Sequence, residues 1–192
     1  MTAERSAAIV LTGPPGVGKT TTGRAFAREL GAALLDLDTL TNPLVEVVAG
    51  LIGAPGDYAD PELARLVREP RYAALVDTAV DCLSAGVSVV LVAPFTAERT
   101  DPAAWERLAA RLRAAGGDPV LVWLRADADL VATRMRRRAE PRDVAKLAAL
   151  RDGGGAVDLA EPRSPHLVVD AARPVAAQVR AVIRSCGPLR ER

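Results

Sequence analysis

The chain has 192 residues, of which 49% are apolar and 26% are charged. This length and composition predict one compact folded unit and exclude a disordered chain or two full domains. The 25 basic and 24 acidic side chains leave a net charge of +1, which gives no general attraction to nucleic acid or to a membrane. No apolar stretch is long enough to span a membrane, so we expect a cytoplasmic monomer or homodimer that binds small molecules.

Five short apolar runs alternate with helix-like stretches, a rhythm typical of parallel strands joined by helical crossovers. The expected strands are residues 8–11, 33–37, 87–92, 120–124 and 167–169. The expected helices are residues 19–30, 128–138 and 175–185, and one that starts at Pro102 after the cap Asp101. The alternation predicts a three-layer α/β/α fold with a mostly parallel five-stranded sheet.

Two longer segments interrupt this rhythm within the single domain that we expect over residues 1–192. Residues 40–85 separate two strands by more than one helix and predict a helical insert, with helices near 44–52 and 61–83. Residues 139–165 contain glycines at 153–155 and are expected to form a lid and a mobile loop. Segments of this length often carry binding elements, so both are candidate parts of a site.

A phosphate-binding motif follows the first expected strand. Its residues match G-x-x-x-x-G-K-[ST] in full and are Gly13, Pro14, Pro15, Gly16, Val17, Gly18, Lys19 and Thr20. The glycines turn backbone amides toward an anion, and the following helix adds its positive dipole end. Lys19 is expected to reach the β- and γ-phosphates and Thr20 to bind Mg²⁺, with Thr21 also beside the nucleotide. The motif predicts a P-loop NTPase that binds ATP or GTP.

Two carboxylates, Asp36 and Asp38, end the second expected strand in the sequence LLDLDTL. Their period-two spacing predicts that both point to the same side of the sheet, at the edge that faces the phosphate loop. A carboxylate there can assist magnesium or accept the proton of an attacking hydroxyl. The alternative, above all for Asp38, is that the side chain caps a helix that starts near Thr39.

The third expected strand ends without an acidic residue, in the sequence VSVVLVAPF. AAA+ motors and ABC-type ATPases need a carboxylate here to hold magnesium and position water, so the sequence argues against both classes. Pro94, Phe95 and Thr96 are expected at this strand end, where Phe95 is a candidate contact for a second substrate.

Basic residues gather after the fourth expected strand, in RMRRR at 134–138. Arg134 and Arg138 lie four residues apart and so share one face of the expected helix. Arg142 follows that helix and is a candidate catalytic residue, because an arginine can neutralise the charge of a transferring phosphoryl group. The alternative is a solvated basic face that neighbouring acidic residues balance.

With these motifs in this order, the chain resembles the small P-loop kinases. That group includes shikimate kinase, gluconate kinase, chloramphenicol phosphotransferase, nucleoside monophosphate kinases and small kinases classed as AAA-type ATPases. The resemblance implies that Asp36 assists magnesium and that Asp38 contacts the acceptor hydroxyl. It further implies that Arg134 and Arg138 bind nucleotide, that the loop around Arg173 lies near the base, and that the insert holds the acceptor.

The insert contributes arginines suited to an anionic acceptor, because a guanidinium binds a carboxylate or phosphate bidentately. The candidate acceptor contacts are Arg68, Arg71 and Tyr72, with Arg99 after the third strand as a further candidate. A surface helix that carries Arg68 beside Glu69 is the alternative.

Three functional hypotheses follow from these residues. The first is a kinase that uses ATP, or GTP, with Mg²⁺ to phosphorylate a hydroxyl of a small metabolite or antibiotic, which the two aspartates favour. The second is a nucleoside or nucleotide kinase, which the arginine-rich segment favours, and a zeta-toxin-like sugar-nucleotide kinase stays open beside it. The third is a nucleotide-binding regulatory protein with little turnover.

Overall fold

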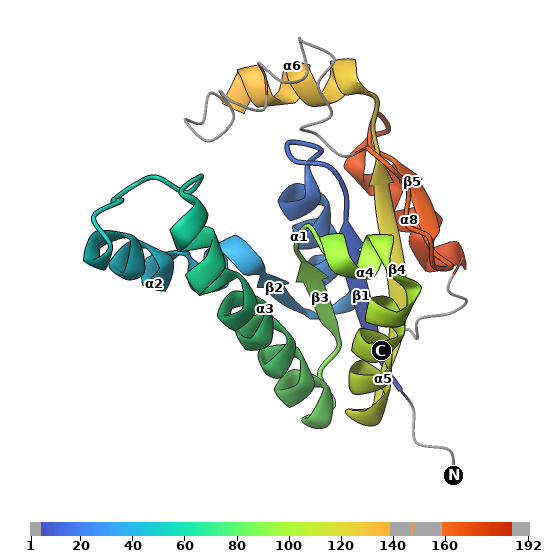
Figure 1. Ribbon diagram of the computed structural model, residues 1–192. Helices are drawn as coiled ribbons and strands as arrows, with labels where there is room; N and C mark the ends of the chain where they lie inside the picture. The colour runs from blue at the N-terminus through green and yellow to red at the C-terminus, as the bar shows by residue number, and fades with distance from the viewer. Residues whose placement is uncertain (1–4, 139–146, 148–158, 186–192) are drawn as a thin grey trace.

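The computed structural model describes residues 5–138, 147 and 159–185 of the chain. A five-stranded sheet in the order β2-β3-β1-β4-β5 lies at its centre, and all neighbouring strands are parallel (Figure 1). The strands are β1 (Ser6–Thr12), β2 (Ala33–Asp36), β3 (Val89–Val92), β4 (Gly117–Arg125) and β5 (Leu167–Asp170). The predicted parallel sheet is confirmed, and the carboxyl ends of its strands meet at one edge, where open α/β sheets bind ligands.

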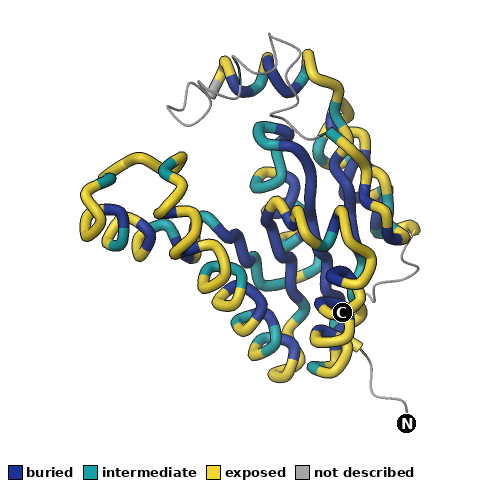
Figure 2. The backbone as a smooth tube through the Cα atoms, in the orientation of Figure 1, coloured by how far each residue is buried: buried dark blue, intermediate teal, exposed yellow. Residues whose placement is uncertain are grey.

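Helices cover both faces of the sheet, as the alternating pattern predicts. One face packs against α3 (Pro61–Ser84) and α5 (Pro102–Ala114), and the other against α1 (Lys19–Leu30) and α8 (Val175–Ser185). In β1, Ala8 and Val10 belong to the first layer and Ile9 and Leu11 to the second, because successive strand side chains point to opposite faces. The strands therefore form the buried centre of the molecule (Figure 2).

Two further helices begin near the carboxyl ends of strands, at the edge of the sheet where the phosphate loop lies. The short α4 (Thr96–Thr100) comes shortly after β3, and α6 (Ala128–Arg138) comes after β4. The sequence predicted α6 with its bounds but gave no signal for α4. Among the helices that the structure describes, none is both long and apolar enough to cross a membrane.

The helical insert consists of α2 (Leu37–Leu51) and α3, and it projects from the β2 side of the sheet (Figure 1). The predicted start of its first helix near residue 44 is wrong, because Asp36 caps the helix at Leu37. Asp36 Oδ1 accepts hydrogen bonds from the backbone N–H groups of Asp38 at 3.1 Å and Thr39 at 3.2 Å. Asp38 therefore lies in the first helical turn, and the predicted strand face shared by the two aspartates is also wrong.

Close packing of α1 on the sheet depends on Gly23. A Cβ at this position would lie 2.6 Å from Val92 Cγ2, which is buried in β3. We expect Gly23→Val to lower the free energy of unfolding by about 2 kcal/mol through overpacking. The helical Gly50 has no atom within 4 Å of such a Cβ, so Gly50→Ala is expected to raise stability by up to ~1 kcal/mol. Urea denaturation of both variants measures these changes. Equal changes in the free energy of unfolding would contradict the close approach of α1 to β3 at Gly23.

Candidate active site

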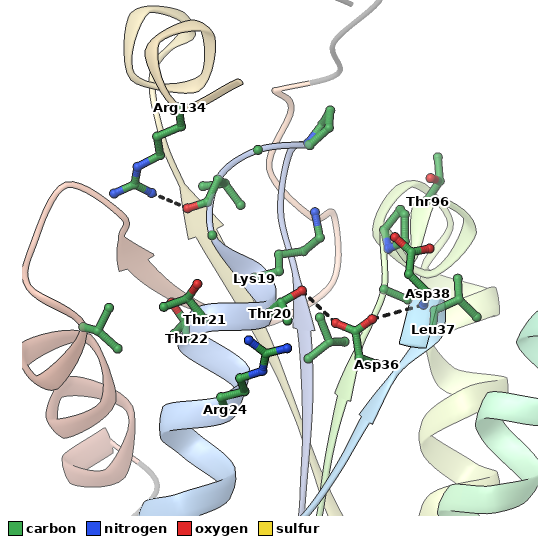
Figure 3. Close-up of a pocket in the computed structure, with 18 of the residues that line it drawn as sticks. Lys19, Thr20, Thr21, Thr22, Arg24, Asp36, Leu37, Asp38, Thr96 and Arg134 are labelled. Carbon is green, nitrogen blue, oxygen red and sulfur yellow. Dashed lines mark hydrogen bonds between the residues drawn. The ribbon is translucent and has the colours of Figure 1, made fainter. Parts of the chain in front are cut away.

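A cavity of about 1360 Å³ opens at the carboxyl ends of β1, β2 and β3. Lys19 and Thr20 lie in its middle, Asp36 and Asp38 lie to one side, and Arg134 lies to the other (Figure 3). Small-molecule sites commonly have volumes of roughly 300–1,000 Å³. The cavity is therefore large enough for a nucleotide together with a second molecule.

The backbone shape of the phosphate loop depends on its glycines, and the Lys19 side chain lies against the loop. Gly16 and Gly18 have φ angles of 75° and 101°, in the left-handed region that residues with a Cβ avoid. At Gly13, an added Cβ would lie 2.9 Å from the carbonyl oxygen of Leu124. Lys19 Nζ donates 2.9 Å hydrogen bonds to the carbonyl oxygens of Gly13 and Pro14. The ammonium group and the N-terminus of α1 thus lie at one loop, as an anion site requires.

Next to this loop, side-chain oxygen atoms of Thr20 and Asp36 lie together. The Thr20 hydroxyl donates a 2.7 Å hydrogen bond to Asp36 Oδ2, and the Asp36 residue is 7% exposed. The cap of α2 holds the other carboxylate oxygen, so the side chain has a fixed orientation. Mg²⁺ is commonly bound by one or two protein oxygens together with substrate phosphates. The hydroxyl and carboxylate fit the magnesium site predicted from the sequence.

Asp38 follows Asp36 in the chain and contacts the second helix of the insert. The contact is made by Arg71 of α3. Arg71 Nη2 donates to Asp38 Oδ1 at 2.7 Å and to Asn42 Oδ1 at 2.9 Å, and its Nε donates to Thr41 Oγ1 at 2.7 Å. The Arg71 side chain is 19% exposed and that of Asp38 is 49% exposed. The partly buried guanidinium therefore orients a carboxylate that is half exposed at the cavity.

The wall of the cavity beside Arg71 is formed by Tyr72. The Tyr72 hydroxyl accepts a 3.2 Å hydrogen bond from the backbone N–H of Phe95, and the two rings meet edge to face at 5.9 Å. Phe95 has a φ of 43°, which is rare for a residue with a side chain. Burial, and next the negative charge of Glu98, raise the pKa of Tyr72 to about 12. The hydroxyl therefore stays protonated and can donate a hydrogen bond into the cavity.

The raised pKa of Tyr72 predicts a loss of stability in alkali. The ordinary tyrosine pKa is about 10, so the folded state binds the phenolic proton more tightly than the unfolded state. Stability is then complete below pH 10 and falls as the pH rises toward 12. We expect the wild type to lose about 1 kcal/mol more than Tyr72→Phe between pH 9 and pH 11. Urea denaturation at both pH values measures this difference, and parallel losses in the two proteins would contradict it.

At the opposite end of the cavity, Arg134 joins two loops. It donates through Nη1 to the carbonyl oxygen of Val17 and through Nη2 to that of Ala171 at 2.7 Å. Arg173 lines the same end, as the sequence led us to expect. Arg134 thus lies beside the predicted nucleotide, although its present contacts are with the protein backbone.

Two predicted acceptor contacts lie elsewhere. The guanidinium of Arg99 lies 5.1 Å above the Trp123 ring, and Arg99 is only 5% exposed. Phe95 is fully buried against Tyr72 and does not line the cavity. Both side chains therefore pack within the protein, and the prediction that they contact the acceptor is not supported. Arg68 does line the cavity.

The structure does not describe the side chains of two of the predicted arginines. Arg142 and most of the expected lid, residues 139–146 and 148–158, fall outside the described residues. Arg138 ends α6, but its side chain is likewise outside that set. Their roles stay predictions.

Several lining residues carried no signal that sequence motifs could detect. They are Arg24, Tyr58 and Gln178. Arg24 lies within the helix after the phosphate loop, and a search of that helix's exposed polar positions could have found it. Tyr58 and Gln178 come from segments far apart in the chain, which only the fold brings together.

Comparison with known proteins defines the family. Residues 9–156 match the sequence family described as AAA domain. The chain belongs to this family. The predicted resemblance to small P-loop kinases is also confirmed by a shikimate kinase from Bradyrhizobium diazoefficiens, which is 34% identical over 139 residues. That match covers 69% of this chain and 55% of the relative.

Solved structures extend the likeness to nearly the whole fold. A protein from Chloroflexus aurantiacus has a TM-score of 0.68 at 25% identity and covers 96% of this chain and 97% of its own. A gluconokinase from Sinorhizobium meliloti has a TM-score of 0.58 at 22% identity and covers 94% and 92%. The chain spans about half the length of the curated relatives it matches.

Proposed function

We propose that the protein is an ATP-dependent phosphotransferase that moves the γ-phosphate to a hydroxyl group of a small metabolite or antibiotic. The observation that carries the proposal is the arrangement of Lys19, Asp36 and Asp38 along one cavity. Lys19 offers a cation for the phosphates, and Asp38 offers an open carboxylate at the end where the γ-phosphate would lie. The kinase names among the relatives and solved structures also support this proposal.

Each group has a distinct part in the proposed reaction. The phosphate loop and Lys19 hold the triphosphate, and Thr20 with Asp36 would hold Mg²⁺, which neutralises phosphate charge when bound. Asp38 orients the acceptor hydroxyl and takes its proton as the oxygen attacks phosphorus. Arg71 fixes the Asp38 carboxylate, and Arg68 and Tyr72 give the acceptor one cationic and one hydroxyl contact.

We further propose that residues 1–192 form one kinase domain, with residues 40–85 as the acceptor-binding insert. The contacts of α2 and α3 with Asp38 support this assignment for the insert. The lid role of residues 139–165, including Arg142, is part of the same proposal. Closure there would exclude water and suppress idle hydrolysis.

A coupled assay of ADP release with Mg-ATP tests the proposal across sugars, sugar acids, aminoglycosides, other antibiotics and nucleoside monophosphates. We expect one acceptor class to stimulate ADP release at least about tenfold, with the stimulation lost in Lys19→Ala. Stimulation by nucleoside monophosphates alone would favour the nucleotide kinase. ATP binding without stimulation by any class would contradict the proposal and favour a regulatory protein.

A further inference from the structure

The cavity has a second end, and its chemistry differs from that of the acceptor end. Thr21 and Thr22 of α1 lie on the side of the cavity away from Asp36 (Figure 3), and the loop beyond β5 and the start of α8 contribute Ala172, Arg173, Pro174, Val175 and Gln178 to the lining. A triphosphate whose γ-phosphate lies toward Asp38 must direct its nucleoside toward this end. The guanidinium of Arg173 and the ring of Pro174 offer flat surfaces, on which an aromatic base can stack.

The wall of this end is the loop 171–174, and Gln178 from α8 holds its backbone. Gln178 is 3% exposed. Its Nε2 donates to the carbonyl oxygens of Arg173 at 2.7 Å and of Ala171 at 3.3 Å. Its Oε1 accepts a 2.9 Å hydrogen bond from the hydroxyl of Thr22, which is itself buried in α1. One side chain therefore joins the helix of the phosphate loop to the loop beyond β5.

These bonds belong to a longer connection around the cavity end. The carbonyl oxygen of Ala171, which Gln178 contacts, also accepts from Arg134, and Arg134 donates in turn to Val17 of the phosphate loop. Thr22, Gln178, Ala171, Arg134 and Val17 thus form one continuous set of hydrogen bonds. Buried groups of this kind are costly to leave unpaired, so the set favours a single loop position.

We propose that Gln178 is a positioning residue for the nucleobase, because it fixes the loop 171–174 against which the base packs. The inference rests on the proposed nucleotide site. It predicts that Gln178 contributes mainly to the affinity for the nucleoside part of the ligand, because the phosphates are held by Lys19 and the backbone of the loop at residues 13–20.

Calorimetric titration of the full chain with two probes, Mg-ADP and magnesium tripolyphosphate, tests the inference. In Gln178→Met, which keeps the size and removes the polar ends, Mg-ADP affinity is expected to fall about tenfold. Tripolyphosphate affinity is expected to stay within twofold, and this probe also reports whether the variant is folded. Thr22→Val leaves both hydrogen bonds that Gln178 Nε2 donates to the loop, so Mg-ADP affinity should fall only about threefold. Arg180→Ala, on the exposed side of α8, should match the wild type.

Different failures lead to different conclusions. Unchanged Mg-ADP affinity in Gln178→Met would overturn the inference, and the proposed nucleotide site would stand. An equal loss for both probes would show that Gln178 acts on the whole fold and would also overturn it. A wild type that binds neither probe would overturn the proposed function and the inference together.

Discussion

Replacing Lys19 with alanine is expected to reduce the affinity for a nonhydrolysable Mg-ATP analogue by at least about 100-fold, the largest effect that the structure predicts on binding. A charged hydrogen bond is worth roughly 1.5–3 kcal/mol, and Lys19 can contact two phosphates from its position on the Gly13 and Pro14 carbonyls. The backbone shape of the loop depends on its glycines, so it should survive the substitution.

Isothermal calorimetry measures this change, with Arg28→Ala as the matched control. Arg28 is an exposed arginine in the last turn of the same helix, away from the cavity lining. We expect the control to bind the nonhydrolysable Mg-ATP analogue as the wild type does. Unchanged affinity in Lys19→Ala would contradict the assignment of the phosphate loop as the nucleotide-binding site.

Replacing Asp38 with asparagine is expected to lower kcat by about 10²- to 10⁴-fold, the range for loss of a general base. The amide has the same size and its oxygen can still accept from Arg71, so the local structure should be retained. We assign nucleotide binding to the phosphate loop and Lys19, and Mg-ATP affinity should therefore change by less than about threefold.

The matched control is Asn42→Ala, which removes a neighbouring hydrogen bond to Arg71 and leaves the carboxylate in place. We expect only a few-fold fall in kcat for this control. Steady-state kinetics with the stimulating acceptor measures both variants. Near-normal turnover in Asp38→Asn would exclude Asp38 as the base.

The phosphate site and the sheet could be predicted because their determinants are local. Gly16, Gly18, Lys19 and Thr20 are adjacent in sequence, and each acts through its own backbone or side chain. The strands were predicted because their apolar runs reflect burial on both faces. No knowledge of the rest of the chain is needed for either inference.

The roles of Asp36 and Asp38 could not be assigned from the sequence, because the assignment depends on where β2 ends and α2 begins. From the sequence either could cap the following helix, and only the end of β2 at Asp36 decides between them. Asp36 combines the cap with a bond to Thr20, and Asp38 is left to pair with Arg71, which lies 33 positions away. The spacing of two aspartates in the sequence does not reveal which of them caps the helix and which pairs with Arg71.

Tertiary packing also explains the errors and omissions at the site. In the sequence Arg99 resembles any exposed arginine, but the fold brings it over Trp123 and buries it. Gln178 is one polar residue in an amphipathic helix, and its importance depends on Thr22, which is 156 positions away. Contacts of this kind leave no periodic signal in a single sequence.

Phosphorus NMR of a complete reaction tests the central claim most directly. Mg-ATP is incubated with the acceptor that stimulates ADP release, and the fate of the γ-phosphorus is followed. Phosphoryl transfer predicts a new phosphate-ester resonance that grows in step with ADP and is missing in Lys19→Ala. Release of all the γ-phosphorus as inorganic phosphate would show a nucleotide hydrolase and contradict the account.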